Sequence, residues 1–364
     1  MRIEVFQLKE LPKILERSIF KNSANIPISQ VRADSHFANP RADQEDKVMW
    51  CLFENDNLVA YRLMLPDTLF HESKKLKMAW MSCLWVHPNH RGKGYGKQVT
   101  IPALEAWGYK VMGTNFAPAS LSLYKSLGDF YAFRIVEGLR LYYKSNASKL
   151  LKNRSTFFKF LSPLLSIGDR ILNLARPTAK VNPLSGEGIQ IQGLPFLDEE
   201  SLGFIERFKK LEFFQRGGSE LDWILAKPWI LQKPKPDADD ERFHFSSQAK
   251  RFSQSVHKIS YQGRLSAVLI SSLVNDKMSI PYAYFDKPFT SKVAQYIENL
   301  LIEDEAEMVT IFNPHLVDYF NKTNVQALHK KKFIKRFMAF KGIPEAWSKS
   351  PFQLQTGDGD GAFT

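Results

Sequence analysis

The sequence predicts a protein of the α/β (α+β) class, built from two successive domains of strands and helices with a connecting segment between them. Three observations indicate this class. Apolar, strand-like runs alternate with helix-compatible segments along the chain. A length of 364 residues is sufficient for two domains, each with its own core. A similar order of elements occurs twice, first in residues 1–145 and again in residues 187–342.

The first domain is expected to alternate short strands with helices. We expect strands at 3–8, 49–53, 58–65, 78–86, 109–116, 130–135 and 140–143, and helices at 11–20, 98–107 and 119–127. The turn Asn55-Asp56-Asn57 joins two of these strands as a hairpin. Residues 22–46 and 66–77 are polar and predict connections, of which the first is long enough to be functional.

The clearest functional signal lies in residues 84–97, Leu-Trp-Val-His-Pro-Asn-His-Arg-Gly-Lys-Gly-Tyr-Gly-Lys. This stretch links a predicted buried strand to a predicted helix, and glycines alternate with other residues where the two meet. The first amides of a helix have no internal partners and carry partial positive charge, so they attract anions. Glycines let the backbone approach a ligand closely. Arg91, Lys93 and Lys97 add positive charge, and the stretch therefore predicts a phosphate-binding loop.

The spacing of the glycines excludes two familiar phosphate loops. A nucleoside-triphosphate loop has four residues between its glycines and then Lys and Ser or Thr, whereas three residues separate Gly92 from Gly96 and Gln98 follows Lys97. A dinucleotide fingerprint has the form Gly-x-Gly-x-x-Gly, which is absent here. The remaining pattern is Leu-x-Val-x-Pro followed by Arg-x-x-Gly-x-Gly. It resembles the pyrophosphate loop of the GNAT superfamily of acyl-CoA-dependent N-acetyltransferases.

This resemblance covers residues 1 to about 145 and implies the GNAT fold, a mixed, mostly antiparallel central sheet flanked by helices. It implies acetyl-CoA as cosubstrate and no metal. In the family, the backbone of the strand before the loop binds the pantetheine arm, and an amide there polarises the thioester carbonyl. The implied cofactor-binding residues are Leu84, Trp85, Val86, Arg91, Gly92, Lys93, Gly94, Tyr95, Gly96, Lys97 and Asn115.

Tyr124 is the catalytic residue that the resemblance implies. The family often carries the pattern Ala-x-x-x-Tyr-x-x-x-Gly, whose Tyr protonates the departing thiolate. Tyr124 precedes Gly128 by four residues as required, while Ser120 occupies the Ala position. The alternative is that Tyr124 only packs and bonds locally. Asn115 lies two residues earlier than the usual position of a cofactor-contacting Asn.

The sequence does not reveal a general base. Many family members place a Glu on the strand before the loop, but this strand offers only Ser82 and Cys83. Water, Asp34, His36 and Glu72 are the remaining candidates for accepting the amine proton. We expect Cys83 to be a core residue, because a nucleophilic thiol needs an activating partner or a lowered pKa.

The second domain, residues 187–342, is expected to be a degenerate GNAT-like copy. We expect strands at 256–261, 265–273, 279–285, 308–312 and 333–340, and helices at 293–302 and 315–321. The position of the phosphate loop reads Asp286-Lys287-Pro288-Phe289-Thr290 and has no glycine, so we expect this half to bind no CoA. The tail, residues 343–364, is expected to be disordered, because its Gly-Asp-Gly-Asp-Gly run lacks the other ligands of a calcium loop.

The connector, residues 146–186, carries seven basic and one acidic side chain among apolar positions at helical spacing. Our preferred interpretation is a linker helix that packs across both domains. A basic amphipathic helix on a membrane surface or an acidic partner is the alternative.

Composition limits the remaining possibilities. The net charge is +12, and residues 1–145 carry 20 basic against 14 acidic side chains, whereas residues 187–364 carry 23 of each. The excess near the first domain suits an anionic ligand. The only two cysteines have no disulfide or metal spacing, and the chain has neither a signal-peptide pattern nor a run of about 20 apolar residues. We therefore expect a cytoplasmic protein.

The leading hypothesis is an N-acetyltransferase that moves an acetyl group from acetyl-CoA to a primary amine of an unidentified acceptor, by direct attack in a ternary complex. The alternative is a non-catalytic acyl-CoA-binding sensor or regulatory module. A third is an adaptor that binds a membrane surface or nucleic acid through the connector, which predicts a steep salt dependence. We do not expect nucleic acid to be the partner.

Overall fold

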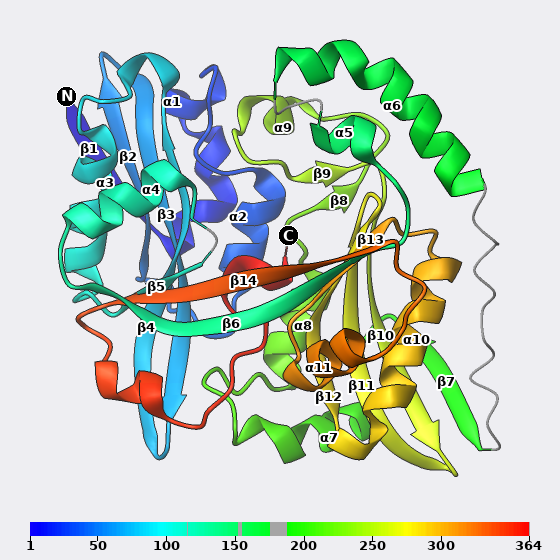
Figure 1. Cartoon of the computed structure of the whole chain (residues 1–364). Coiled ribbons are helices and arrows are strands. Elements are labelled where there is room, and N and C mark those ends of the chain that lie inside the picture. Colours follow the sequence, from blue (N-terminus) through cyan, green and yellow to red (C-terminus); the bar gives the residue numbers. More distant parts are fainter. Residues whose placement is uncertain (115, 152–154, 175–187, 364) are drawn as a thin grey trace. The chain divides into compact units, whose positions relative to one another are not determined.

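The chain folds into two compact units, and neither is a single stretch of sequence. The computed structural model describes residues 1–114, 116–151, 155–174 and 188–363 (Figure 1). Unit 1 comprises residues 1–136, 195–252 and 335–364, and unit 2 comprises residues 137–194 and 253–334. These limits differ from the boundaries expected from the sequence, which placed 1–145, 146–186, 187–342 and 343–364 in successive segments.

Two strands explain this difference. The unit boundary falls within β6 (Phe130–Tyr142) and again within β14 (His329–Phe340). The end of β14 pairs with β5 (Val111–Gly113) in unit 1, and the end of β6 pairs with β13 (Met308–Ile311) in unit 2. Each half of the chain thus contributes a strand segment to the other unit. Local sequence pattern cannot reveal such an exchange, because it depends on pairing between residues that are 166 to 227 positions apart.

The sheet of unit 1 has the strand order β1–β2–β3–β4–β5–β14–β6. The strands not yet given are β1 (Arg2–Gln7), β2 (Lys47–Glu54), β3 (Asn57–His71) and β4 (Lys74–Val86). Neighbouring strands from β1 to β4 are antiparallel, and β4 and β5 are parallel. The sheet is therefore mixed and mostly antiparallel, as expected. The predicted connection at 66–77 is wrong, because Leu69 and Leu76 continue the pairing of β3 with β4.

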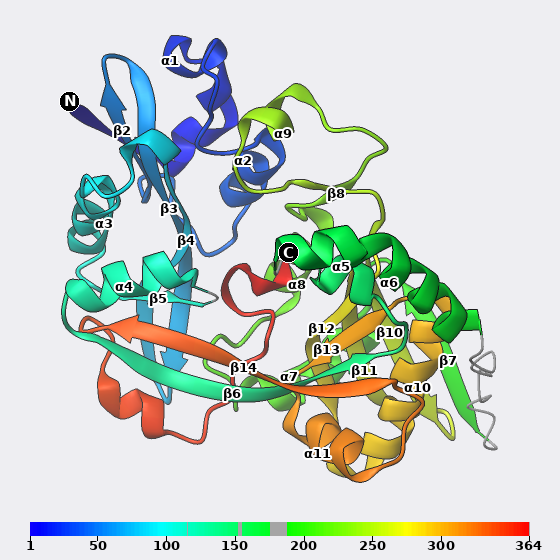
Figure 2. The ribbon, with the colours of Figure 1, turned by 45° about the horizontal axis from the view of Figure 1, so that its top comes forward.

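Helices cover both faces of this sheet (Figure 2). Side chains alternate along β2, so Met49, Cys51 and Phe53 belong to one apolar cluster and Trp50 and Leu52 to another. The first cluster includes residues of η1 (Leu8–Glu16), α1 (Ser18–Lys21) and α2 (Gln30–Phe37). The second includes residues of α3 (Tyr95–Ala106) and α4 (Pro118–Ser126).

Helix α2 lies where the sequence predicts a loop. The helix is only 8 residues long and its buried side chains include Arg32, Ser35 and His36. Because polar residues face inward, the apolar periodicity that normally marks a helix is missing. This short polar helix contributes directly to the candidate site.

Residues 195–252 belong to unit 1 although they follow the connector. Their elements are α7 (Glu199–Lys209), α8 (Gly218–Ala226), β8 (Leu231–Gln232), α9 (Ala238–Arg242) and β9 (Gln248–Ala249). A buried ion-pair network attaches this segment. Asp67 accepts from Arg41 and Arg216, and from the indole N–H of Trp80 at 2.8 Å. Burial alone would raise the pKa of Asp67, but the two guanidinium groups hold it below its usual value.

Residues 343–363 of the C-terminal tail are ordered, contrary to the sequence expectation. It contains η4 (Glu345–Lys349) and η5 (Gly359–Ala362). Phe363 is 1% exposed and stacks on Trp229 with ring centroids 4.5 Å apart and planes 8° apart. The edge contact of Phe363 with Trp223 completes an aromatic clamp. These indoles lie in residues 195–252, so the tail sequence alone gives no sign of its anchor.

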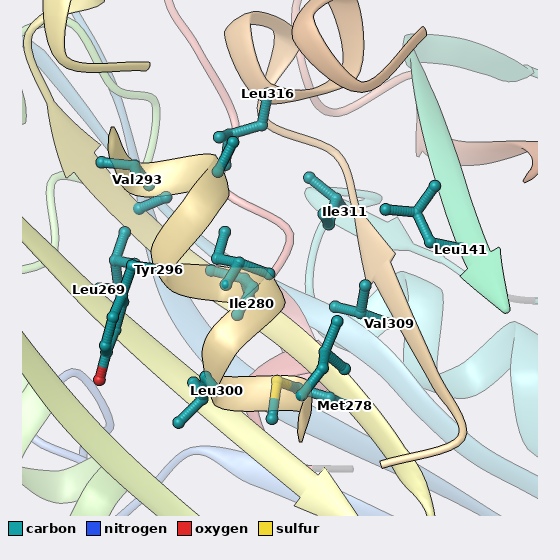
Figure 3. Close-up of a cluster of buried hydrophobic side chains, with 14 of the residues drawn as sticks. Leu141, Leu269, Met278, Ile280, Val293, Tyr296, Leu300, Val309, Ile311 and Leu316 are labelled. Carbon is teal, nitrogen blue, oxygen red and sulfur yellow. The ribbon is translucent and has the colours of Figure 1, made fainter. Parts of the chain in front are cut away.

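Unit 2 has the strand order β14–β6–β13–β12–β11–β10–β7. Its remaining elements are α5 (Ala147–Leu151), α6 (Thr156–Leu174), β7 (Ile189–Leu194), β10 (Phe252–Tyr261), β11 (Arg264–Val274), β12 (Lys277–Phe285), η3 (Lys287–Phe289), α10 (Thr290–Glu303) and α11 (Pro314–Lys322). Helix α10 packs its apolar side chains on this sheet (Figure 3). The predicted strand and helix order of this half is confirmed.

Helix α6 is amphipathic, but its apolar side is not covered. Phe160, Leu164 and Leu174 are 85%, 65% and 82% exposed, and Ile167 and Ile171 are also exposed. The preferred expectation of a packed linker helix is therefore not met for these side chains. No helix in the described part of the chain has the length and apolarity to cross a membrane.

Candidate functional site

The site is built around β4, where its pairing with β5 stops. Among the described residues, the two strands pair at Ala79 with Val111 and at Trp80 with Met112 and no further. The register of β3 with β4 shifts between the pairs of Arg62 and Met64, so two residues of β4 bulge out just beyond this point. A cavity of about 400 Å³ opens there. Its lining residues are Arg32, Met81, Ser82, Cys83, Leu84, Thr114, Phe116, Ala117, Ser120, Tyr124, Ile230, Phe245, Ser246 and Asp360.

The glycine-rich turn follows the C-terminal end of the same strand, a few residues beyond the cavity. Gly92 and Gly94 have φ values of 82° and 81°, and a Cβ atom at either position would meet no heavy atom within 4 Å. Gly94 is the N-cap of α3, and its carbonyl accepts from the amides of Lys97 and Gln98. The amides of the first helical residues have no acceptor within the helix. An open helix start of this kind suits an anion.

Neighbouring residues hold the turn in place. A Cβ atom on Gly96 would lie 3.5 Å from Val86 on β4 and 3.5 Å from Leu123 on α4. Tyr95 is buried, and its hydroxyl donates to Glu54 at 3.1 Å. The side chains of Arg91, Lys93 and Lys97 are exposed. Residues 91–94 thus form the turn and residues 95–97 begin α3, with Tyr95 packing inward and the basic side chains in solvent.

Tyr124 lines the cavity from α4 and is 2% exposed. A guanidinium N–H of Arg62 donates to its hydroxyl oxygen at 2.8 Å. The oxygen therefore acts as acceptor on the side of Arg62, which leaves the O–H free to donate elsewhere. Edge contacts with Phe116 and Phe130 fix the ring. This arrangement can present a proton to a group bound in the cavity.

Arg62 is a site residue that our sequence reasoning missed. It lies on β3, is fully buried, and also donates to the carbonyl of Ser82 at 3.4 Å. Its guanidinium lies 5.2 Å from the centroid of the Tyr124 ring. A lone arginine inside the apolar run 58–65 was the available signal, since charged residues are rarely buried without a role.

Cys83 lines the cavity, yet its environment opposes nucleophilic chemistry. Burial raises the pKa of the thiol to about 11, although the guanidinium groups of Arg32 and Arg62 act in the opposite direction. A thiol with this pKa stays protonated near neutral pH and is a poor nucleophile. Cys83 belongs to the apolar cluster on the α2 face of the sheet, as expected of a core residue.

None of the three side chains considered as general base lines the cavity. Asp34 is exposed and accepts from Gln30, and Glu72 is exposed at the β3–β4 turn. His36 is fully buried, and burial together with Arg32 holds its pKa well below the usual value. The acidic residue that does line the cavity is Asp360 of the tail. Asn115 lies outside the described residues.

No group of three or more metal-ligating side chains occurs in the described ranges. The site combines three features near the end of β4: a cavity, a tyrosine that accepts a hydrogen bond from a buried arginine, and the open start of the helix that follows the strand.

Comparison with known proteins gives one family match. Residues 16–128 match the acetyltransferase (GNAT) family. None of the curated proteins is similar enough in sequence to count as a match.

Three solved structures share the fold over most of the chain. A tandem GNAT protein from the clavulanic acid biosynthesis pathway is 14% identical, with a TM-score of 0.51 over 94% of this chain and 99% of that one. A probable N-acyltransferase from Enterococcus faecalis is 10% identical, with a TM-score of 0.51 over 93% and 71%. Saccharomyces cerevisiae N-myristoyltransferase with bound myristoyl-CoA is 13% identical, with a TM-score of 0.50 over 93% and 82%. At these identities the likeness concerns the fold alone.

Proposed function

We propose that the chain is an N-acetyltransferase, because residues 16–128 match the acetyltransferase (GNAT) family and the whole chain has a fold similar to that of a tandem GNAT protein. It transfers an acetyl group from acetyl-CoA to a primary amine by direct attack in a ternary complex. The match of residues 16–128 to this family supports acyl transfer in general. The acetyl group, the amine and the single-step mechanism are the proposal.

The turn at residues 91–97 binds the pyrophosphate of CoA. The amides of Gly94, Tyr95 and Gly96 at the start of α3 donate to its oxygens, and the helix dipole adds to the attraction. Arg91, Lys93 and Lys97 are exposed around this helix start and screen the remaining negative charge. The absence of side-chain atoms at Gly92 and Gly94 leaves room for the diphosphate.

The pantetheine arm lies along Leu84, Trp85 and Val86, where β4 no longer pairs with β5 among the described residues. Backbone groups on this edge hydrogen-bond the arm, and a backbone amide polarises the thioester carbonyl. Fixed donors of this kind stabilise the oxyanion that develops when the amine attacks. This path leads the thioester from the glycine turn into the cavity.

Tyr124 protonates the departing thiolate. Its hydroxyl oxygen accepts from Arg62, so its own proton is directed away from that guanidinium. A positioned acid typically accelerates such a step by 10²–10⁴-fold. The observation that carries the whole proposal is that the open helix start and the cavity with Tyr124 flank the same short segment of β4.

Release of free thiol from acetyl-CoA across a panel of primary amines tests this function. We expect turnover with at least one amine, and binding of acetyl-CoA measured by calorimetry. Myristoyl-CoA in the same assay tests acyl length, and we expect it to be the poorer donor because acyl group and acceptor share a cavity of about 400 Å³. Binding of acetyl-CoA without turnover of any amine would support an acyl-CoA sensor instead.

A further inference from the structure

Arg32 is a buried cation that its own chain does not fully satisfy. It lies on α2, is 5% exposed and lines the cavity. Its guanidinium stacks on the Trp229 ring at 3.6 Å and donates to the Ser82 hydroxyl. Its Nε–H is buried and has no hydrogen-bond partner among the described residues. Leaving such a donor unpaired is costly, so a ligand oxygen is the natural partner.

Asp360 supplies the opposite charge to the same cavity. It lies on η5, and Thr114 donates to its Oδ1 at 3.4 Å. The buried ammonium of Lys335 on β14 and the Cys83 thiol on β4 also interact electrostatically with this carboxylate. The aromatic clamp at Phe363, three residues later, anchors this part of the tail. A cation and a carboxylate therefore line one cavity from two separate elements, α2 and the tail.

The rest of the lining is largely apolar. Phe116, Ile230 and Phe245 contribute three hydrophobic side chains. A volume of about 400 Å³ lies near the lower end of the range for small-molecule pockets, roughly 300–1,000 Å³. A small acceptor with two opposite charges and an apolar body matches this lining.

We propose that the acceptor is a small amino acid with an apolar side chain, recognised through both its charged groups. Arg32 binds the acceptor carboxylate, and Asp360 binds the ammonium group and removes its proton. This inference rests on the proposed acetyltransferase function and names its acceptor class and its general base. Binding of a carboxylate by a guanidinium is a strong, charge-assisted interaction.

The transfer balances with these groups. Asp360 takes one proton from the ammonium, and the freed lone pair of the amine attacks the thioester carbon. A C–N bond forms, and the C–S bond then breaks with its electron pair on sulfur. Tyr124 gives its proton to the thiolate and regains one from the amide nitrogen. The net products are the N-acetyl amino acid, CoA thiol and one proton, which Asp360 returns to solvent.

Matched pairs of acceptors test the carboxylate contact. L-Phenylalanine against 2-phenylethylamine, and L-leucine against 3-methylbutylamine, differ only in the carboxylate. We expect kcat/KM for thiol release to be at least 10-fold higher for each amino acid than for its matched amine. The simple amine has no carboxylate, so it leaves the buried donor of Arg32 unpaired. Arg32→Gln should remove this preference, chiefly by raising KM for the amino acid.

Two further variants keep this test meaningful if Arg32→Gln is unstable. Arg32→Lys retains the positive charge but loses the planar fork, so it should recover part of the preference. Arg17→Gln removes an exposed arginine in surface ion pairs and should leave the preference unchanged. Thermal melting of each variant separates loss of binding from loss of fold.

Asp360→Asn tests the base through its pH profile. The variant should lose at least 10-fold in kcat/KM near pH 7 and recover towards pH 9.5, where free amine becomes available without a base. Asp318→Asn on α11, an exposed residue paired with Lys322, should leave the profile unchanged. A purely structural role for Asp360 would lower the rate equally at all pH values and would contradict the assignment.

The outcomes separate this inference from the function on which it rests. Turnover of the simple amines at or above the rate of the amino acids overturns the acceptor class while the acetyltransferase stands. Binding of acetyl-CoA with no turnover of any probe overturns both. Failure to bind acetyl-CoA removes the proposed cofactor site itself.

Discussion

Units 1 and 2 contain the same bulged hairpin but differ at the residues that carry chemistry. The register of the hairpin shifts between Arg62 and Met64 in unit 1, and between Ile270 and Ser272 in unit 2. At this shift, one residue of β3 lies opposite two residues of β4, and one residue of β11 lies opposite two residues of β12. Counting from the shift, fully buried Arg62 corresponds to fully buried Ile270. Both units keep the shifted backbone pairing, but unit 2 has no charged residue at this position.

The helices that follow the short parallel strands show the same contrast. Helices α4 and α11 each have nine residues and begin with proline, at Pro118 and Pro314. The seventh residue is Tyr124 in α4 and Phe320 in α11, and both are buried. The hydroxyl that Arg62 contacts in unit 1 is thus absent from unit 2, together with the arginine.

The connections from strand to helix differ most. Residues 87–94 join β4 to α3, whereas only residues 286–289 join β12 to α10. The shorter connection contains no glycine, and its N-cap, Phe289, has φ −88°. Hydrophobic patterning therefore maintains the fold in both units, while the residues proposed to bind the anion and donate the proton occur in unit 1 and not at the corresponding positions of unit 2.

The largest expected effect comes from closing the glycine turn. Gly94→Glu places a side chain at φ +81° and a carboxylate where the pyrophosphate is proposed to bind. We expect acetyl-CoA affinity to fall by more than about 100-fold, which is more than about 2.7 kcal/mol. Calorimetric titration with acetyl-CoA measures this. Lys287→Glu in the connection of unit 2 is the matched control and should leave affinity unchanged; an equal loss there would mean that both units bind CoA.

Making α4 like α11 is the next test. Tyr124→Phe removes the hydroxyl and keeps the ring, so we expect thiol release to fall by roughly 100-fold while acetyl-CoA binding is retained. Tyr319→Phe on α11 should have no effect on either quantity. Unchanged turnover in Tyr124→Phe would assign the tyrosine a packing role and leave leaving-group protonation to water.

Local features explain what the sequence could predict. The apolar runs of β2 and β11 and the positive-φ glycines at 92 and 94 are local features of the sequence, so the strands and the helix start follow from them. Helix α2 was missed because its buried face is polar. Arg62 was overlooked, although an arginine inside an apolar strand was visible in the sequence.

The rest of the site depends on contacts between distant parts of the chain. Arg32 and Asp360 are 328 positions apart in sequence and line one cavity, and the aromatic clamp is one of the contacts that hold the tail there. The exchange of strand segments by β6 and β14 is likewise a long-range property. No periodicity or motif reports such pairings, which is why the base and the unit boundaries escaped prediction.

Two single substitutions, Arg62→Ile and Ile270→Arg, each place the residue of one unit at the corresponding position of the other. Arg62→Ile should lower turnover by about 10-fold, since Tyr124 loses the donor that orients its hydroxyl. Its melting temperature should stay within a few degrees, because an apolar residue of similar reach often replaces a buried charge without loss. Kinetics and calorimetric melting measure the two effects.

The reverse change, Ile270→Arg, buries a cation in the apolar interior of unit 2. We expect it to destabilise unit 2 by roughly 3 kcal/mol or more, as an unpaired buried charge does. Hydrogen exchange in β11 and β12 reports this unit separately. Protection equal to that of the wild type would show that unit 2 can accommodate the buried charge. That result would contradict the conclusion that the two units differ at this position.

The smallest expected effect concerns pH. His257 of unit 2 accepts or donates at both ring nitrogens, to Ser271 at 2.7 Å and Tyr296 at 2.8 Å, and burial lowers its pKa to about 4. The unfolded chain, with a pKa near 6.5, binds this proton more readily, so the contribution of His257 to stability is present above pH 6.5 and is lost as pH falls towards 4. Between pH 7.5 and 5.5 this amounts to about 1 kcal/mol.

In unit 1, burial and the nearby Asp358 raise the pKa of Glu212 to about 8, which gives the opposite sign: stability falls as pH rises from 4.5 to 8. Hydrogen exchange at pH 5.5 and 7.5 should therefore show β10 gaining protection and the segment around Glu212 losing it as pH rises, after correction for intrinsic rates. Glu212→Gln should abolish only the second trend, and a change of the same sign in both units would contradict the assignment of these two groups.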